Sequence, residues 1–87
     1  MNSATVPSFW EQYRKLDREM RGKVRKAYRL WTEDSFHPSL RFKCINRSEN
    51  IWSVRVTLGY RALGLLDKDT VTWFWIGGHD DYEHFFG

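Results

Sequence analysis

Two arginines near the middle of the sequence have the type and spacing to bind a phosphate. Arg55 and Arg61 lie in two runs of alternating apolar and polar residues, separated by a short turn at residues 57–59. If the turn has three residues, the runs form an antiparallel hairpin in which Val56 pairs with Tyr60 and Arg55 faces Arg61. Two like charges placed so repel each other by roughly a few tenths of a kcal/mol to 1 kcal/mol. Such a pair suggests an anion between the guanidinium groups.

A histidine and a tyrosine near the end of the chain could transfer protons beside that anion. His79, Tyr82 and Glu83 are spaced i, i+3 and i+4, so a helical tail would place them on one side of a turn. Two glycines precede His79 and let the backbone bend back over the sheet. Histidine is the natural proton carrier near neutral pH. Together with the arginines, these residues form a set that could cleave a phosphodiester.

The same residues could also have purely structural roles. The arginines could extend into solvent or pair with Asp80, Asp81 or Glu83, and a turn of even length would separate them. His79 could be a surface histidine, with Asp80 and Asp81 as favourable charges at a helix N-terminus. The placement of the side chains decides between the catalytic and the structural roles.

The remaining reactive side chains give no stronger candidate site. His79, Asp80, Asp81 and His84 match no well-defined pattern of metal ligands. The single cysteine, Cys44, can form neither an internal disulfide nor a cysteine-based zinc site, and it alternates into the apolar side of its run. We therefore expect no metal and no other cofactor. The aromatic run at 73–75 could stack on bases, but its position in the predicted sheet favours core packing.

Helix is predicted over about residues 8–32. Ser8 and Glu11 fit a capping box at its start. Apolar residues then recur at steps of three and four: Phe9, Tyr13, Leu16, Met20, Val24, Ala27 and Trp31. The apolar phase is continuous, and Gly22 is the only internal helix breaker. We favour a helical hairpin over one long helix because a hairpin buries its ends better.

After a loop at 32–39, the period of the apolar residues changes from 3.6 to 2. This pattern predicts four strands at residues 40–44, 52–56, 60–66 and 70–76, with turns between them. Gly77 and Gly78 should end the last strand, and residues 79–86 should form a short tail. The predicted fold class is α+β, with the helices packed on one face of a four-stranded antiparallel sheet.

Composition is consistent with one small domain covering residues 1–87. Aromatic residues make up 17% of the chain and include five tryptophans, which is enough for a hydrophobic core in a chain of this length. The first ten residues lack the apolar segment of a signal peptide, and no apolar run approaches the roughly 20 residues that span a bilayer. We expect a cytoplasmic protein without membrane contact.

Positive charge is concentrated in the helical half. Residues 1–32 hold eight of the 14 Lys and Arg and three of the 11 acidic residues, a net charge of +5, whereas residues 33–87 carry −2. A basic helical region suggests contact with phosphates or with an acidic partner.

The chain resembles the RelE/ParE superfamily of type II toxins from about residue 9 to residue 86. The resemblance lies in the segments HPSLRFKCI, IWSVRV, GYRALGLL and TVTWFWIGGHDDYEHFF, and its most specific patterns are S-V-R, Y-R-A-L and G-x-H-D-x-Y. The helical region FWEQYRKLDREMRGKVRKAYRLW is similar to the two-helix hairpin that precedes the sheet in that family, although the prolines often found near its turn are absent. The resemblance therefore implies a helical hairpin followed by a sheet.

In RelE-like members, which cut mRNA on the ribosome, the resemblance implies roles for individual residues. Arg55 and Arg61 match the strand arginines of the cleavage site, and His79 matches the basic or histidine position after the last strand. Tyr82 is a looser match to a C-terminal aromatic residue. The tail HDDYEH departs from the family pattern, since it is acidic where many ribosome-dependent relatives are strongly basic.

The resemblance also implies RNA contacts and partners. Lys43 and Arg41 match, more loosely, basic first-strand residues that contact RNA. The expected function is a metal-free, ribosome-dependent mRNA endoribonuclease. The alternatives are a ParE-like inhibitor of DNA gyrase without RNase activity and a catalytically inactive member that only binds its antitoxin. In each case the resemblance implies a cognate antitoxin, with operator DNA bound only through the toxin–antitoxin complex.

Overall fold

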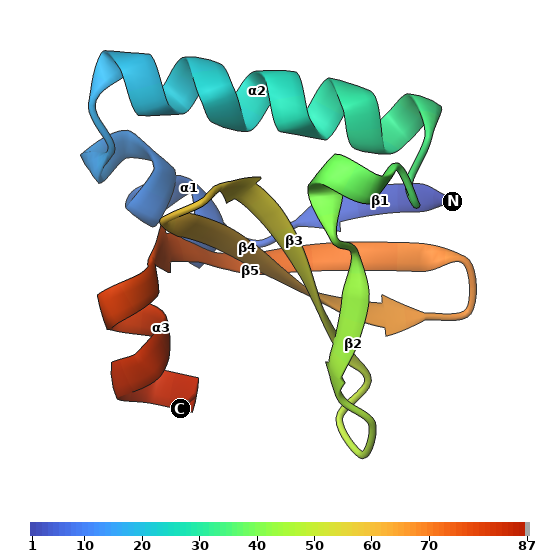
Figure 1. The fold of residues 1–87 in the computed structure, drawn as a ribbon. Helices are drawn as coiled ribbons and strands as arrows, with labels where there is room; N and C mark the ends of the chain where they lie inside the picture. The colour runs from blue at the N-terminus through green and yellow to red at the C-terminus, as the bar shows by residue number, and fades with distance from the viewer. Residues whose placement is uncertain (87) are drawn as a thin grey trace.

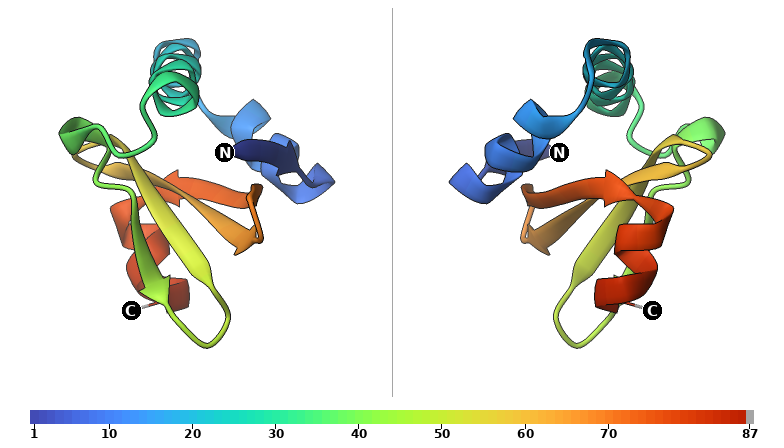
Figure 2. Two further views of the ribbon diagram at one scale, coloured as in Figure 1. Left: turned by 90° about the vertical axis from the view of Figure 1, so that its right-hand side faces the viewer. Right: turned by 90° about the vertical axis from the view of Figure 1, so that its left-hand side faces the viewer.

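The computed structural model describes the backbone of residues 1–86 and the side chains of residues 1–83. Two helices, α1 and α2, cover one face of a twisted sheet, and a short third helix, α3, lies on the other side (Figures 1 and 2). The elements in chain order are β1 (Asn2–Thr5), α1 (Pro7–Lys15), α2 (Arg18–Glu33), a 3₁₀ helix (Pro38–Leu40), β2 (Lys43–Asn46), β3 (Ile51–Thr57), β4 (Tyr60–Asp67), β5 (Thr70–Gly78) and α3 (His79–Phe86). No described helix is long and apolar enough to cross a membrane.

The sheet has five strands in the order β1-β5-β4-β3-β2, one more than the sequence pattern predicts. β2 to β5 form the expected antiparallel meander, and β1 adds to the outer edge of β5 in parallel, from Asn2 opposite Thr70 to Thr5 opposite Trp73. The alternation of apolar residues missed β1 because its segment, Asn-Ser-Ala-Thr, is mostly exposed. Backbone pairing, rather than burial of alternate side chains, holds this strand.

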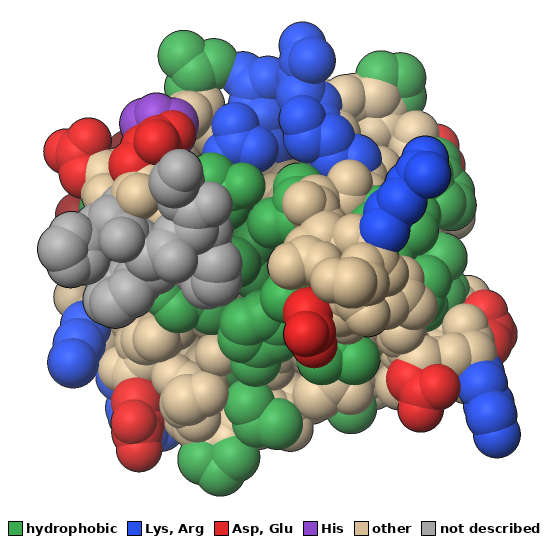
Figure 3. All heavy atoms as spheres, turned by 90° about the horizontal axis from the view of Figure 1, so that it is seen from below, with side chains coloured by type: hydrophobic (Ala, Val, Ile, Leu, Met, Phe, Trp, Pro, Cys, Tyr) green, Lys and Arg blue, Asp and Glu red, His purple; other side chains and the backbone are tan. Residues whose placement is uncertain are grey.

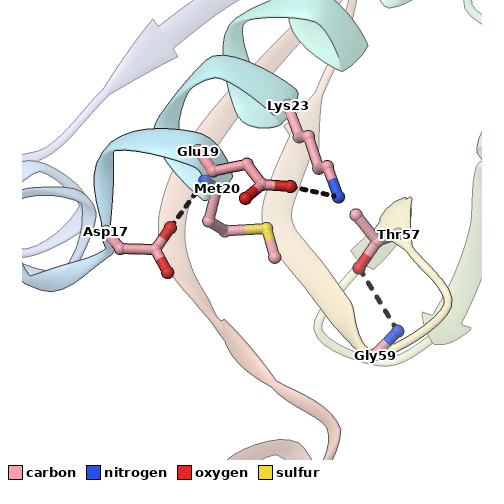
Figure 4. A network of polar contacts seen from close by, with 6 residues as sticks. All are labelled: Asp17, Glu19, Met20, Lys23, Thr57 and Gly59. Atoms are coloured by element: carbon pink, nitrogen blue, oxygen red, sulfur yellow. Dashed lines mark hydrogen bonds and ion pairs between the residues drawn. The ribbon is translucent and has the colours of Figure 1, made fainter.

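Two helices form where the pattern allowed one or two. Leu16 has an extended backbone, and Asp17 then caps α2, its Oδ1 accepting a hydrogen bond of 2.7 Å from the backbone N–H of Met20 (Figure 4). The predicted capping box is wrong. α1 begins one residue earlier, at Pro7, whose fixed φ suits the first helical position, and Ser8 bonds to β5 instead.

The first predicted strand begins later than expected. Leu40 belongs to the 3₁₀ helix that Pro38 opens, and Arg41 follows in the left-handed conformation with φ 45°. β2 therefore starts at Lys43 rather than at residue 40. Leu40 and Phe42 are both buried, so the alternation at 40–44 predicted the burial of these side chains correctly. It did not predict the backbone conformation of residues 40–42.

The β3–β4 hairpin reaches the predicted arginine pairing by a different route. Its turn has two residues, Leu58 and Gly59, so Thr57 rather than Val56 pairs with Tyr60. A bulge between Arg55 and Thr57 adds one residue to β3 and restores the register. Arg55 therefore lies opposite Arg61, and the predicted pairing is confirmed.

β5 contains a second bulge and extends beyond its predicted end. Leu63 pairs with Trp75 and Gly64 with Trp73, so Phe74 is the extra residue. Gly77 and Gly78 continue the strand instead of ending it. A Cβ at Gly77 would lie 2.7 Å from the Trp75 ring, so only glycine fits beneath that indole.

The hydrophobic core lies between the helices and one face of the sheet. Trp31 of α2 is 1% exposed and makes edge-to-face contacts with the rings of Phe42 and Trp73. The buried apolar residues of this cluster are Phe9, Val24, Trp31, Leu40, Phe42, Val54, Ala62, Val71, Trp73 and Ile76. Alternate residues of β3, β4 and β5 therefore face the helices, and the residues between them face the other side of the sheet.

Candidate functional site

The arginine pair lies on the sheet face opposite the helical core. Val54 and Ala62 pair with each other and pack in the core, so their neighbours Arg55 and Arg61 project from the other face. Both arginine residues are half-buried. A view from below shows an apolar centre on this face and Lys and Arg side chains gathered along one rim, beside a histidine and acidic groups (Figure 3).

Helix α3 is fixed next to this pair by its first residue. The backbone N–H of His79 donates a hydrogen bond of 2.7 Å to the carbonyl of Gly59, in the turn that joins the two arginine-bearing strands. Gly59 is itself held by a 3.3 Å bond from its N–H to Thr57 Oγ1 (Figure 4). The end of β5 and the β3–β4 turn are therefore connected, and α3 begins at the same end of the sheet as the arginines.

Aromatic rings connect Arg61 to the imidazole. The guanidinium carbon of Arg61 lies 5.5 Å from the centre of the Tyr82 ring, which is a cation–π distance. The His79 and Tyr82 rings are nearly parallel, at 16° with centroids 6.4 Å apart, and Trp75 contacts Tyr82 at the same centroid distance. Tyr82 thus contacts both Arg61 and His79, and the predicted grouping on one side of a helical tail is present.

Glu83 lies next to the histidine. Its Oε1 lies 3.4 Å from His79 Nε2, with the two side chains 57% and 52% exposed. An exposed pair of this kind contributes little to stability. It places a carboxylate beside one imidazole nitrogen.

The arginines keep their positive charges available to a ligand. Within the described side chains, no Asp or Glu lies within ion-pair distance of Arg55 or Arg61. Among the described side chains, Asp80, Asp81 and Glu83 therefore form no ion pair with the arginines. Two adjacent guanidinium groups can bind the non-bridging oxygens of a phosphate with bidentate, charge-assisted hydrogen bonds.

The two residues expected to contact RNA occupy different positions. Lys43 pairs with Ser53, which is two residues from Arg55 in β3, so Lys43 lies on the same sheet face as the arginines. It is exposed. Arg41 is also exposed but precedes β2 in the left-handed turn, so the sheet register does not place it on this face.

The described side chains form no group that could hold a metal ion. Nowhere among residues 1–83 do three His, Cys, Asp or Glu side chains gather closely enough to coordinate one. His84, one of the ligand candidates considered from the sequence, lies outside the described side chains.

A hollow lies on the helical side, away from this site. It has a volume of about 530 Å³ between β1, α1 and α2, and its apolar floor includes Phe9, Val24 and Trp73. Arg25 and Arg29 of α2 line it, and none of its lining residues is acidic. We call it the helix groove. The titratable side chains in its lining are arginines and tyrosines.

A family model described as the ParE-like toxin domain matches residues 18–84. The chain belongs to this family. The matched range of the ParE-like toxin domain includes the arginine pair and the described part of α3, and it confirms the resemblance to the RelE/ParE superfamily. The chain is thus a toxin of the superfamily found in type II toxin–antitoxin systems. No curated protein matches the sequence.

Solved structures share the fold of this ParE-like toxin domain at low sequence identity. YafQ from E. coli strain BL21(DE3) has a TM-score of 0.76 at 10% identity, over 99% of this chain and 98% of YafQ. A chain of the RelB–RelE antitoxin–toxin complex from Methanococcus jannaschii has a TM-score of 0.75 at 14% identity, over 97% and 99%. The YoeB/ParE toxin from Agrobacterium tumefaciens has 0.69 at 18%, over 91% and 99%. The likeness to YafQ spans 99% of this chain, so it includes β1 and α1, which precede the range of the family match.

Sequence reasoning missed the contacts that assemble the site. The bond from His79 to the Gly59 carbonyl joins backbone groups and has no sequence signature. Two polar side chains of α1, Ser8 and Gln12, bond to the backbone of β5. Gln12 gave no signal, because many residues of the helical pattern are polar or charged.

Proposed function

We propose that this toxin is a ribosome-dependent endoribonuclease that cleaves mRNA without a metal. The 2′-hydroxyl of the substrate attacks the adjacent phosphorus, and the bond from phosphorus to O5′ breaks. A base removes the proton of the 2′-hydroxyl, and an acid protonates O5′. The products are a 2′,3′-cyclic phosphate and a free 5′-hydroxyl, so the nucleophile comes from the substrate itself.

Arg61, with Arg55 opposite it, binds the phosphate and stabilises the negative charge that develops on its oxygens. Their adjacency in the β3–β4 register is the observation that carries the proposal. Preorganised donors of this kind contribute about 3–4 kcal/mol to transition-state stabilisation by analogy with oxyanion sites. The Tyr82 ring 5.5 Å from the Arg61 guanidinium limits the positions that this side chain can adopt.

His79 serves as general base or general acid in this mechanism. Its ring stacks on Tyr82, which also contacts Arg61, so the imidazole and the phosphate-binding group share one support. A positioned acid or base contributes typically 10²–10⁴-fold in rate. Tyr82 positions the nucleotide or assists the proton transfer, and Glu83 orients the imidazole.

Ribosomal RNA is bound by the basic side chains outside the cleavage site. α2 presents exposed Arg18, Lys23, Lys26 and Arg29, and Lys43 and Arg41 add positive charge near β2. Each phosphate that these groups neutralise releases counterions, so binding should weaken steeply with salt. The substrate would place the action of the toxin in the cytoplasm.

A cognate antitoxin is the expected protein partner. The RelE and YafQ neighbours include complexes with the antitoxins RelB and DinJ. The helix groove, with an apolar floor and Arg25 and Arg29 in its wall, suits an amphipathic segment whose polar side is acidic. Operator DNA would be bound only through this complex.

The second candidate function is inhibition of DNA gyrase. It is favoured by one specific observation, the match of residues 18–84 to the ParE-like toxin domain. In this case the arginine pair would contact a protein or DNA surface and His79 would have no catalytic role.

Two reactions with the purified toxin separate these functions. In cell-free translation, cleavage of mRNA that requires ribosomes and leaves cyclic-phosphate ends supports the nuclease, and His79→Gln should reduce it about 10²-fold or more. In a gyrase supercoiling reaction, loss of supercoiling with intact mRNA supports the second function and rejects the first. Inactivity in both reactions would leave antitoxin binding as the remaining role.

A further inference from the structure

After β1 ends, side chains of α1 continue to form hydrogen bonds with the outer edge of β5. The last backbone bond from this segment runs from the Val6 N–H to the Trp73 carbonyl, at 3.2 Å. Beyond it, Ser8 Oγ donates to the Phe74 carbonyl at 3.1 Å, and Gln12 Oε1 accepts from the Ile76 N–H at 2.9 Å. Ser8 and Gln12 are four residues apart, so both lie on one face of α1.

These bonds occur where β5 needs them. Phe74 is the extra residue of the bulge, and a bulge leaves its residue without a ladder partner. Ile76 is 3% exposed, so its N–H has little access to water and requires a protein acceptor. Gln12 supplies that acceptor from a helix, whereas a regular sheet would supply it from a neighbouring strand.

Ile76 lies between the two parts of the candidate site. It pairs with Ala62, the residue after Arg61, and it is followed by Gly77, Gly78 and His79. Two consecutive glycines have little conformational preference of their own, so their neighbours fix the direction in which the chain enters α3. On one edge of β5 the glycines pair with Arg61 and Tyr60 of β4, and on the other edge Gln12 holds the strand at Ile76 just before them. The His79–Gly59 bond follows just after them.

We infer that Gln12 is a positioning residue: through the Ile76 N–H it fixes the end of β5 and thereby the placement of α3, with His79 and Tyr82, beside Arg61. The inference rests on the proposed nuclease function for its kinetic consequence. Its structural consequence is independent of that function. The family match begins at residue 18, so Gln12 also lies outside the range that the match covers.

The test compares Gln12→Leu, which has similar size but no acceptor, with Gln12→Glu, whose carboxylate can accept the same bond. Glu11→Leu, at the neighbouring exposed position, is the matched control. At a temperature where circular dichroism shows all variants folded, Gln12→Leu should exchange the Ile76 amide faster and lower kcat by up to about 10²-fold with KM unchanged. Gln12→Glu should restore most of the slow exchange of the Ile76 amide and most of kcat. Glu11→Leu should match wild type in both measurements. If Gln12→Leu does not fold, Gln12→Asn, which is one methylene too short to reach Ile76, replaces it.

A second readout keeps this inference separate from the proposed function. In NMR spectra the nuclear Overhauser contacts of the Tyr82 ring with the Arg61 side chain and with the Trp75 ring, which join α3 to the sheet, should weaken in Gln12→Leu and return in Gln12→Glu. Wild-type kcat in Gln12→Leu, or unchanged ring contacts, would overturn the positioning role. If the wild-type toxin cleaves no RNA, the nuclease proposal fails, and the ring contacts alone decide the inference about Gln12.

Discussion

The two faces of the sheet use the same strands for different purposes. On the helix side, Val54, Ala62 and Ile76 pack in an aromatic-rich core. On the opposite side, their direct neighbours Arg55, Arg61 and Gly77 form or support the arginine site. Because strand residues alternate between faces, burial of the core residue next to each arginine determines the face from which that arginine projects.

The two faces also differ in how much their packing can change. Core side chains interdigitate, and a lost group leaves a cavity that neighbours fill only in part. The arginines are half-buried and need only point toward an incoming anion. Substitutions in the helix-side core should therefore reduce stability, and substitutions of the two arginines should reduce activity with little effect on stability.

The largest expected loss of stability is at Trp31. This side chain is 1% exposed and contacts the rings of Tyr28, Phe42 and Trp73. Trp31→Ala should lower the free energy of unfolding by about 3–5 kcal/mol, measured by urea denaturation. Trp31→Phe should cost clearly less, because the buried Nε1 has no hydrogen-bond partner among the described residues. Equal losses in the two variants would contradict a dominant role for ring packing.

Arg61→Ala should have the complementary result. The variant loses a phosphate-binding group but little core contact, so mRNA cleavage should fall about 10²–10³-fold. The urea midpoint should stay close to wild type, since Arg61 is on the far side of the sheet from the core. Arg47→Ala, in the exposed β2–β3 turn, is the control for loss of one positive charge. Equal cleavage by Arg61→Ala and wild type would remove the arginine pair from the mechanism.

Gly64→Ala tests how tightly the helix-side face is packed. An added Cβ would meet the side chains of Val71 and Trp73, so the core must shift to accept it. The expected loss of stability is about 1–3 kcal/mol. Gly59→Ala, where nothing lies within 4 Å and φ is not positive, should change the unfolding free energy little. A neutral Gly64→Ala would show that this face is looser than the contacts indicate.

The sequence was sufficient for features that depend on periodic burial. The apolar spacing over 8–32 predicted the helical region, and the period of two predicted the antiparallel strands. It also placed Arg55 opposite Arg61, although that prediction assumed a three-residue turn. The turn in the structure has two residues, one fewer than predicted, and the bulge adds one residue to β3. The two differences offset each other, so Arg55 still pairs with Arg61. A bulge of this kind has no local pattern that distinguishes it from a longer turn.

Features that depend on backbone pairing at a distance were not predictable. β1 has no apolar alternation, so nothing in Asn2–Thr5 indicates the strand that it joins. Ser8 matched a helix-capping pattern, but its hydroxyl bonds to Phe74, 66 residues away. The grouping of His79 and Tyr82 was predictable because it depends on i, i+3 spacing within one helix, whereas the attachment of that helix to Gly59 was not.

The smallest expected effect is at the boundary between α1 and α2, where the helices that cover the core change direction. Asp17 Oδ1 accepts from the Met20 N–H at 2.7 Å and is the N-cap of α2. Asp17→Ala should lower the free energy of unfolding by about 1 kcal/mol, and Asp17→Asn, which keeps an acceptor oxygen, should restore most of it. Both variants should cleave RNA as wild type does, because the cap lies on the helical side. If Asp17→Ala reduced cleavage while stability was unchanged, the coupling of α1 to the site would extend beyond the Gln12–Ile76 bond, and the division of roles between the two faces would be wrong.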